Sequence, residues 1–313
     1  MRSFYGVTLL LLTLVLAASV ACSSVPASAG GDLSGRKIRA VTTIGQIGDL
    51  VHNVGGDRVE VIALMGPGVD PHLYKASEGD VTRLNSADII FYNGLNLEGK
   101  MSDLFVRLAR TRPAVAVTED IPVEQLLEPP EFAGHYDPHI WFDVTMWKQA
   151  TGTVERALSE LDPANAATYQ ANADRYRQEL DALHEWAASE ITTIPRERRV
   201  LVTAHDAFGY FGQQYDVEVV GLQGISTESE AGVGDVQALA DLIASRGVKA
   251  MFVESSVPHR NIEAVQAAVR AKGNDVIIGG EIFSDAMGEP GTPTGTYIGM
   301  FQHNVETIVT ALR

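Results

Sequence analysis

Short runs of β-branched residues alternate with helical patterns along both halves of the chain, and this alternation constrains the fold most. In the first half, strands are predicted at residues 38–43, 59–63, 88–92 and 114–118. In the second half, they are predicted at residues 200–203, 217–220, 250–254 and 276–279. Such alternation is typical of parallel α/β units. Because 313 residues exceed one ordinary core, two parallel-sheet α/β lobes are predicted.

Helices are predicted between these strands. They are placed at residues 44–54, 79–86, 99–110, 207–214, 233–245, 261–271 and 297–312.

A stretch free of Gly and Pro, residues 164–193, separates the two halves and has apolar residues at helical spacing. Asp162 is typical of a helix cap, and Pro163 suits the first helical position. At 1.5 Å per residue the helix would be roughly 45 Å long, enough to run along both lobes. We therefore predict an amino-terminal lobe at 37–162, a rigid linker helix at 163–193 and a carboxy-terminal lobe at 194–313. Large hinge closure is not expected.

The first residues are typical of an export signal. Arg2 is followed by an apolar run and then by small residues that lead to Cys22. The run is too short to span a bilayer comfortably. Residues 1–22 are predicted to be a signal peptide with Cys22 as the candidate lipidated residue, and residues 23–36 a flexible tether. A plain cleaved signal, in which Cys22 has no role, is the alternative. The protein is expected outside the cytoplasm, anchored to the outer face of the cell membrane or periplasmic.

Net charge and cysteine count limit the kinds of binding partner and of metal site that the protein can have. The formal net charge is −16, which disfavours nucleic acid and anionic membrane surfaces. Contact with the membrane is therefore expected through the lipid anchor alone. Cys22 is the single cysteine, so neither an intramolecular disulfide nor a thiolate metal cluster can form. We expect a monomer without an organic cofactor.

Two Asp-Pro-His tripeptides end at His72 and His139. Proline fixes its own φ and extends the residue before it, so each histidine leaves a stiff backbone in a defined direction. Such stiffness suits a metal ligand. The preceding Asp70 and Asp137 are interpreted either as acceptors for an imidazole N–H or as turn formers, and the sequence leaves both roles open.

Two further candidate ligands follow strands of the second half. His205 comes after the strand at 200–203, and Asp285 follows the strand at 276–279 after a short loop. Open α/β sheets bind ligands beyond the carboxyl ends of their strands. Asp206 and Glu281 are neighbouring carboxylates that could replace a ligand or bond to one. Glu254 is either a hydrogen-bond partner or a helix cap.

If the two lobes face each other, three imidazoles and one carboxylate meet between them, a set suited to a divalent transition metal. His135 lies four residues before His139 and could reach this site or pass metal inward. Surface, capping or packing roles are expected for the remaining histidines: His52, His184, His259 and His303.

Four stretches resemble the cluster A-I metal-binding receptors of ABC transporters, most closely their TroA-like branch. They are GPGVDPHLY at 66–74, DPHIWFD at 137–143, VTAHDAFGYF at 202–211 and GGEIFSDAMG at 279–288. The resemblance covers residues 39–313. It implies two α/β lobes joined by one long helix and delivery of the bound ion to a cognate permease driven by a cytoplasmic ATPase. It implies these metal ligands: His72, His139, His205 and Asp285.

Three imidazoles and a carboxylate disfavour calcium and magnesium, which prefer oxygen shells. Intrinsic affinity is higher for zinc than for manganese, although affinity does not fix the physiological ion. The resemblance implies zinc where the third ligand is a histidine, so Zn²⁺ is expected first as transported ligand and Mn²⁺ close second. We do not expect an enzyme, since the chain has no His-Glu-x-x-His or Gly-x-Ser-x-Gly motif. A zinc metallohydrolase and a surface adhesin with incidental metal stay open as alternatives.

Overall fold

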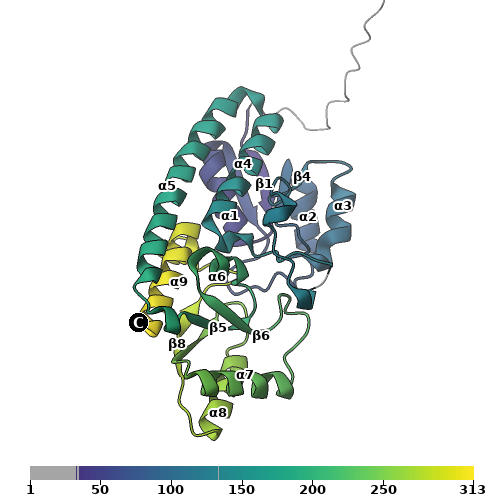
Figure 1. Ribbon diagram of the computed structural model, residues 1–313. Coiled ribbons are helices and arrows are strands. Elements are labelled where there is room, and N and C mark those ends of the chain that lie inside the picture. The colour runs from purple at the N-terminus through teal and green to yellow at the C-terminus, as the bar shows by residue number, and fades with distance from the viewer. Residues whose placement is uncertain (1–32, 34, 133) are drawn as a thin grey trace, which may run out of the picture.

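The computed structural model describes residues 33, 35–132 and 134–313. The predicted signal peptide, Cys22 and most of the predicted tether lie outside the described residues. Figure 1 shows two α/β lobes, with the long helix α5 (Ala166–Thr192) running beside both. The predicted fold class is therefore confirmed, while the lobe boundaries at residues 162 and 194 stay predictions.

The amino-terminal lobe contains one parallel four-stranded sheet in the order β2-β1-β3-β4. Its strands lie at or within two residues of the predicted positions: β1 (Ile38–Thr42), β2 (Val59–Ala63), β3 (Ile89–Tyr92) and β4 (Ala114–Ala116). Its helices are α1 (Gly45–Gly55), α2 (Glu78–Ser86), α3 (Ser102–Leu108) and α4 (Val144–Leu161).

Helix α4 was not singled out from the sequence. Asp143 caps it by accepting hydrogen bonds from the backbone of Thr145 at 2.7 Å and Met146 at 3.4 Å. Its buried face, which includes Trp147 and Leu158, contributes to packing against α5. Gly and several Thr residues give this segment weak intrinsic helix propensity, so tertiary burial decides its structure.

Helix α5 confirms the predicted linker, but its start differs in detail. A 3-10 turn (Pro163–Asn165) precedes it, and the Asp162 side chain makes no capping bond to the backbone. Asp162 Oδ2 instead accepts hydrogen bonds from three side chains: Arg58 Nε at 2.7 Å, Asn165 Nδ2 at 2.8 Å and Tyr169 Oη at 2.9 Å. Asp162 and Pro163 therefore take the predicted N-cap and first positions of this turn, but the Asp162 carboxylate binds side chains instead of capping backbone amides.

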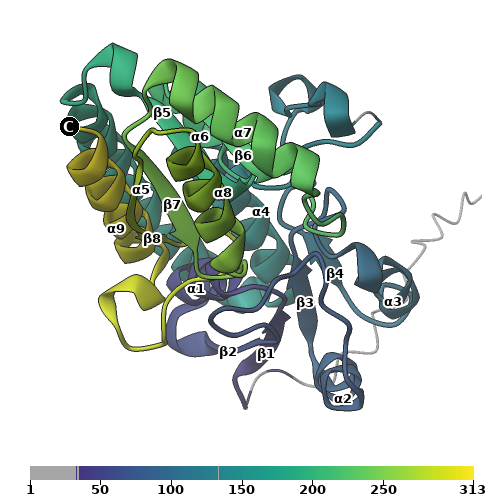
Figure 2. The ribbon, with the colours of Figure 1, turned by 90° about the horizontal axis from the view of Figure 1, so that it is seen from below.

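The carboxy-terminal lobe differs from the amino-terminal one in its sheet. Its strands form two parallel pairs, β5 (Val200–His205) with β6 (Glu218–Gln223) and β7 (Ala250–Glu254) with β8 (Ile277–Ile282). Strand β5 lies beside β7. The helices are α6 (Gly209–Tyr215), α7 (Val233–Arg246), α8 (Arg260–Ala271) and α9 (Tyr297–Leu312), and Figure 2 shows α7 and α8 on one side of the strands.

One hydrophobic core runs through both lobes. It joins the amino-terminal sheet to α4 and α5 and continues to buried residues of α6 and α9, such as Phe211 and Phe301. A second cluster lies between β5, β7, α7 and α8. Wide opening of the lobes would expose part of this shared core and would therefore be costly, while limited hinge motion stays a prediction. Within the described residues, no helix has both the length and the apolar character needed to cross a membrane.

Candidate metal centre

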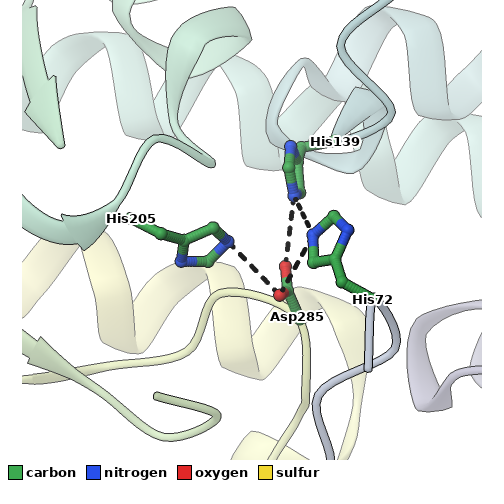
Figure 3. A group of neighbouring side chains, drawn as sticks. All are labelled: His72, His139, His205 and Asp285. Carbon is green, nitrogen blue, oxygen red and sulfur yellow. Dashed lines mark hydrogen bonds and ion pairs between the residues drawn. The ribbon is translucent and has the colours of Figure 1, made fainter. Parts of the chain in front are cut away.

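The four predicted ligands lie together between the lobes, as Figure 3 shows. His72 comes from the loop between β2 and α2, and His139 directly precedes a 3-10 turn (Ile140–Phe142). His205 is the last residue of β5, so the strand is longer than predicted, and Asp285 lies in the loop after β8. All four are buried, and their potential ligand atoms lie within 4.8 Å of one another.

The distances between these atoms suit a metal ion at their centre. From Asp285 Oδ2, the distances are 3.3 Å to His205 Nε2 and 3.7 Å to His72 Nε2. Asp285 Oδ1 lies 3.4 Å from His139 Nε2, which is 3.3 Å from His72 Nε2. Tetrahedral ligands bonded at zinc distances are separated by about 3.3–3.5 Å. Four of the separations are thus close to this value, while the whole set of candidate ligand atoms lies within 4.8 Å.

Three atoms that point into the centre make no hydrogen bond among the described residues and meet other members of the cluster only as ion pairs at 3.3–3.7 Å. They are His205 Nε2 and the two carboxylate oxygens of Asp285. Buried polar atoms are normally paired, because burial without a partner is costly. A bound cation would satisfy all three at once, so the donor set fits a transition metal.

Two of the imidazoles are oriented by carboxylates behind them. Asp137 Oδ1 lies 2.7 Å from His139 Nδ1, and Glu254 Oε2 lies 2.5 Å from His205 Nδ1. An Nδ1–H donated to a carboxylate leaves the Nε2 lone pair free for a metal. Asp137 also accepts from the His139 backbone at 2.9 Å, so it has both roles that the sequence left open. Glu254 is a partner of His205 rather than a helix cap.

The third imidazole is held differently. Asp70 Oδ1 accepts a hydrogen bond from the His72 backbone at 2.8 Å, which is the turn-forming role. Asp70 Oδ2 accepts from Thr227 Oγ1 of the opposite lobe at 2.6 Å. Thr227 lies between β6 and α7, in a segment that reaches the amino-terminal lobe (Figure 2). Sequence reasoning missed Thr227, since no local pattern marks a contact formed across 157 positions.

The electrostatics differ among the imidazoles. Burial lowers the pKa of His72 to about 3, against the attraction of Asp285. Burial would also lower the pKa of His139, but Asp137 and Asp285 outweigh it and raise that pKa to about 9. Before metal binds, His72 is therefore neutral and His139 is protonated at neutral pH.

The pKa values of His205 and Asp285 are also set by burial and by neighbouring charges. Burial opposes protonation of His205, yet the carboxylates of Glu254 and Asp285 raise its pKa well above 6.5. Burial would raise the pKa of Asp285, but His205 and His139 hold it well below 3.8. The metal-free centre therefore contains an ionised carboxylate between two imidazolium groups.

Other candidates lie apart from this group of side chains. His135 is exposed, and its ring packs against Phe132 with centroids 5.2 Å apart. Glu281 forms an exposed ion pair with His259 at 3.0 Å. Neither these residues nor Asp206 belongs to the four-residue cluster that the described chain brings together.

Together, the fold and the site define a two-lobed α/β protein with a buried cluster of three histidines and one aspartate between its lobes. The chain belongs to the ZnuA family, zinc-uptake complex component A, periplasmic, which residues 40–311 match. It is 46% identical over 303 residues to the manganese-binding lipoprotein MntA of Bacillus subtilis, covering 97% of this chain and 99% of that protein.

The same likeness appears with the zinc-binding protein TroA of Treponema pallidum. The sequences are 52% identical over 272 residues, covering 87% of this chain and 88% of TroA. The solved structure of periplasmic TroA matches this fold with a TM-score of 0.86 and 51% identity, covering 88% of this chain and 99% of that one. The predicted resemblance to the TroA-like branch is confirmed.

Proposed function

We propose that the protein is an extracytoplasmic solute-binding protein that captures one divalent transition metal ion between its lobes and delivers it to an ABC permease. The observation that carries this proposal is the convergence of three imidazole Nε2 atoms and the Asp285 carboxylate in a buried pocket, with the candidate ligand atoms within 4.8 Å of one another. The proposed metal ligands are His72, His139, His205 and Asp285.

Zinc is proposed as the first-ranked ion and manganese as the second. Three nitrogen donors and one carboxylate suit Zn²⁺ in tetrahedral geometry, and intrinsic affinity is higher for zinc than for manganese. The names of the relatives support both metals, since MntA is named for manganese and TroA for zinc. Four protein ligands would leave no open position for a catalytic water, so hydrolysis is not proposed.

Anchoring through a lipid on Cys22 and a monomeric state complete the proposal. The name of MntA as a lipoprotein supports the anchor. Mass spectrometry of the amino-terminal peptide from the native membrane tests it, because an unmodified Cys22 would remove the anchor from the proposal. Light scattering of the purified receptor tests the monomer.

Metal titration tests the central claim. Apo protein is titrated with Zn²⁺, Mn²⁺ and Mg²⁺ against a competing chelator at constant pH. We expect one ion per chain, zinc bound more tightly than manganese, and no competition from magnesium. His139→Ala removes one donor and should weaken zinc binding more than 100-fold, in line with the loss of a metal ligand. Unchanged affinity in this variant, or no uptake by the wild type, would contradict the assigned site.

The physiological ion is tested separately. Elemental analysis of protein purified from its native host under metal-replete growth should find zinc above manganese. A predominance of manganese would reverse the proposed ranking while leaving the site intact.

A further inference from the structure

The loop that carries Asp285 is held by its own lobe and, at Ser284, by the opposite lobe as well. Within the carboxy-terminal lobe, Asn304 of α9 clamps Phe283, accepting from its N–H at 2.8 Å and donating to its carbonyl at 2.7 Å. Ser284 bonds to both lobes: its hydroxyl lies 3.0 Å from the Ser256 hydroxyl of its own lobe, and its carbonyl oxygen accepts from the amino-terminal lobe. Asp285 follows directly after Ser284.

Two side chains of the amino-terminal lobe donate to the Ser284 carbonyl. Gln46 Nε2, from the first turn of α1, lies 3.2 Å from this oxygen. Trp141 Nε1, from the turn after His139, lies 3.1 Å from it. One carbonyl with two lone pairs thus accepts both donors.

These donors are fully buried, with exposed fractions of 0% for Gln46 and Trp141. The Ser284 contact is the only hydrogen bond of the Gln46 amide within the described chain, and its Oε1 has no partner there. Water cannot readily replace the carbonyl while the site stays closed. Burying an amide without a hydrogen bond is costly. The bond across the lobe interface is therefore what offsets the cost of burying the Gln46 side chain.

We propose that Gln46 and Trp141 are positioning residues that fix the Asp285 loop from the opposite lobe, so that Asp285 completes the metal site only when the lobes are closed. This inference rests on the proposed function. Neither residue touches the ion; both act through the backbone carbonyl next to a ligand.

The geometry explains how closure and binding are coupled. Separation of the lobes leaves Phe283 with Asn304 and removes Ser284 from its two donors, so Asp285 moves away from His139. A bound ion opposes this separation, because it joins Asp285 to the histidines of the amino-terminal lobe. The metal ion and the two donors, Gln46 and Trp141, therefore favour the same closed state, and each stabilises the contacts that the other makes.

Trp141 contacts a candidate ligand of the amino-terminal lobe and a helix of the carboxy-terminal lobe. Its ring lies beside that of His139, with centroids 5.2 Å apart, and its carbonyl accepts from Tyr297 Oη of α9 at 2.7 Å. A change at the Asp285 loop thus reaches the indole directly. Trp141 fluorescence should respond to metal in the wild type, and this response should become smaller in Gln46→Met.

The test removes each donor while keeping the side-chain bulk. In Gln46→Met and Trp141→Phe, zinc affinity is measured by chelator competition and dissociation by stopped flow after mixing with excess chelator. We expect about tenfold weaker binding in each, as for loss of one buried hydrogen bond, mainly through faster dissociation. The rise in melting temperature on adding zinc should shrink in both variants.

Asn172→Leu is the matched control. Asn172 Nδ2 of α5 donates to the Val54 carbonyl of α1 at 3.0 Å. This bond also joins a side-chain amide to a backbone carbonyl and also involves α1, the helix of Gln46, but it lies away from the ligand loops. This variant should lower the melting temperature of the apo and zinc-loaded forms equally and leave the dissociation rate unchanged.

The outcomes separate the two proposals. If the wild type takes up no metal, the proposed function fails. If the wild type binds zinc but both donor variants keep its dissociation rate, the positioning role is overturned. A loss of apo stability with an unchanged zinc-induced shift would also overturn it, because that pattern indicates packing alone. Trp141→Phe tests the carbonyl independently should Gln46→Met fail to fold.

Discussion

Glu254→Gln is expected to weaken metal binding by changing the tautomer of His205. In the wild type, Glu254 Oε1 accepts the backbone N–H groups of Ala204 at 2.7 Å and His205 at 2.9 Å. Its Oε2 accepts from His205 Nδ1 at 2.5 Å. In the variant the amide oxygen keeps the two backbone bonds, so the NH₂ group faces the imidazole. His205 Nδ1 must then accept, which places the ring proton on Nε2, the atom proposed to bind metal.

The magnitude follows from the bonds that change. A hydrogen bond to a charged group is worth about 1.5–3 kcal/mol, and loss of a carboxylate behind a metal-binding histidine typically lowers affinity by about 10- to 100-fold. Both residues are fully buried, so solvent does not screen the effect. We expect zinc affinity to fall by about 10- to 100-fold, measured by chelator competition at fixed pH.

Glu98→Gln is the matched control. Glu98 is likewise a buried carboxylate that accepts backbone N–H groups, from Asn93 at 2.8 Å and Gly94 at 3.3 Å, as well as the Thr43 hydroxyl at 2.6 Å. It has no imidazole partner among its hydrogen bonds in the described chain. The control should lose stability but keep zinc affinity. If Glu254→Gln bound zinc as tightly as the wild type, Glu254 would not control the tautomer.

Five further predictions concern pH and other side chains. Raising the pH from 7 toward 9 should strengthen zinc binding by about tenfold per unit for each displaced proton, measured by competition at several pH values. Over the same range the apo protein should lose stability in urea titrations. The reason is that the folded-state pKa of His139, about 9, lies above its unfolded value, so its contribution is complete below pH 6.5 and disappears as pH rises through 9. Thr227→Val removes the 2.6 Å bond to Asp70 and should weaken zinc binding about threefold to tenfold; unchanged affinity would remove Thr227 from the site's support. Asp162→Ala leaves three donors without their acceptor and should lower the free energy of unfolding by about 1–3 kcal/mol, measured in urea, with little effect on affinity. His135→Ala should leave zinc affinity unchanged in the same competition assay, and a tenfold loss would return His135 to the site.

The convergence of the four candidate ligands could largely be predicted, because their positions follow local rules. The Asp-Pro-His tripeptides set the backbone at His72 and His139, and strand ends locate His205 and Asp285 in a parallel fold. These rules act over a few residues and are visible in one sequence. Their success required one tertiary assumption, that the two lobes face each other.

The missed features depend on contacts across long distances. Thr227 meets Asp70 across 157 positions, and Gln46 meets Ser284 across 238. No periodicity marks such partners. Asp162 shows the same limit. Its position in the sequence predicts a side-chain cap, but its carboxylate bonds instead to Arg58, a residue far away in the sequence. Local chemistry therefore predicts where ligands leave the chain, and packing decides what holds them there.

The protonation of the metal-free centre suggests how a buried site can exchange a doubly charged ion. His139 and His205 have raised pKa values and His72 a lowered one, so near neutral pH two imidazolium protons accompany the ionised Asp285. Replacing those two protons by one divalent ion leaves the net charge of the pocket unchanged. Neither state then buries an uncompensated charge, the costly condition in a protein interior. Capture should therefore release protons, and calorimetry in buffers of different ionisation enthalpy measures their number. A value near zero at pH 7 would show that the histidines are neutral before metal arrives.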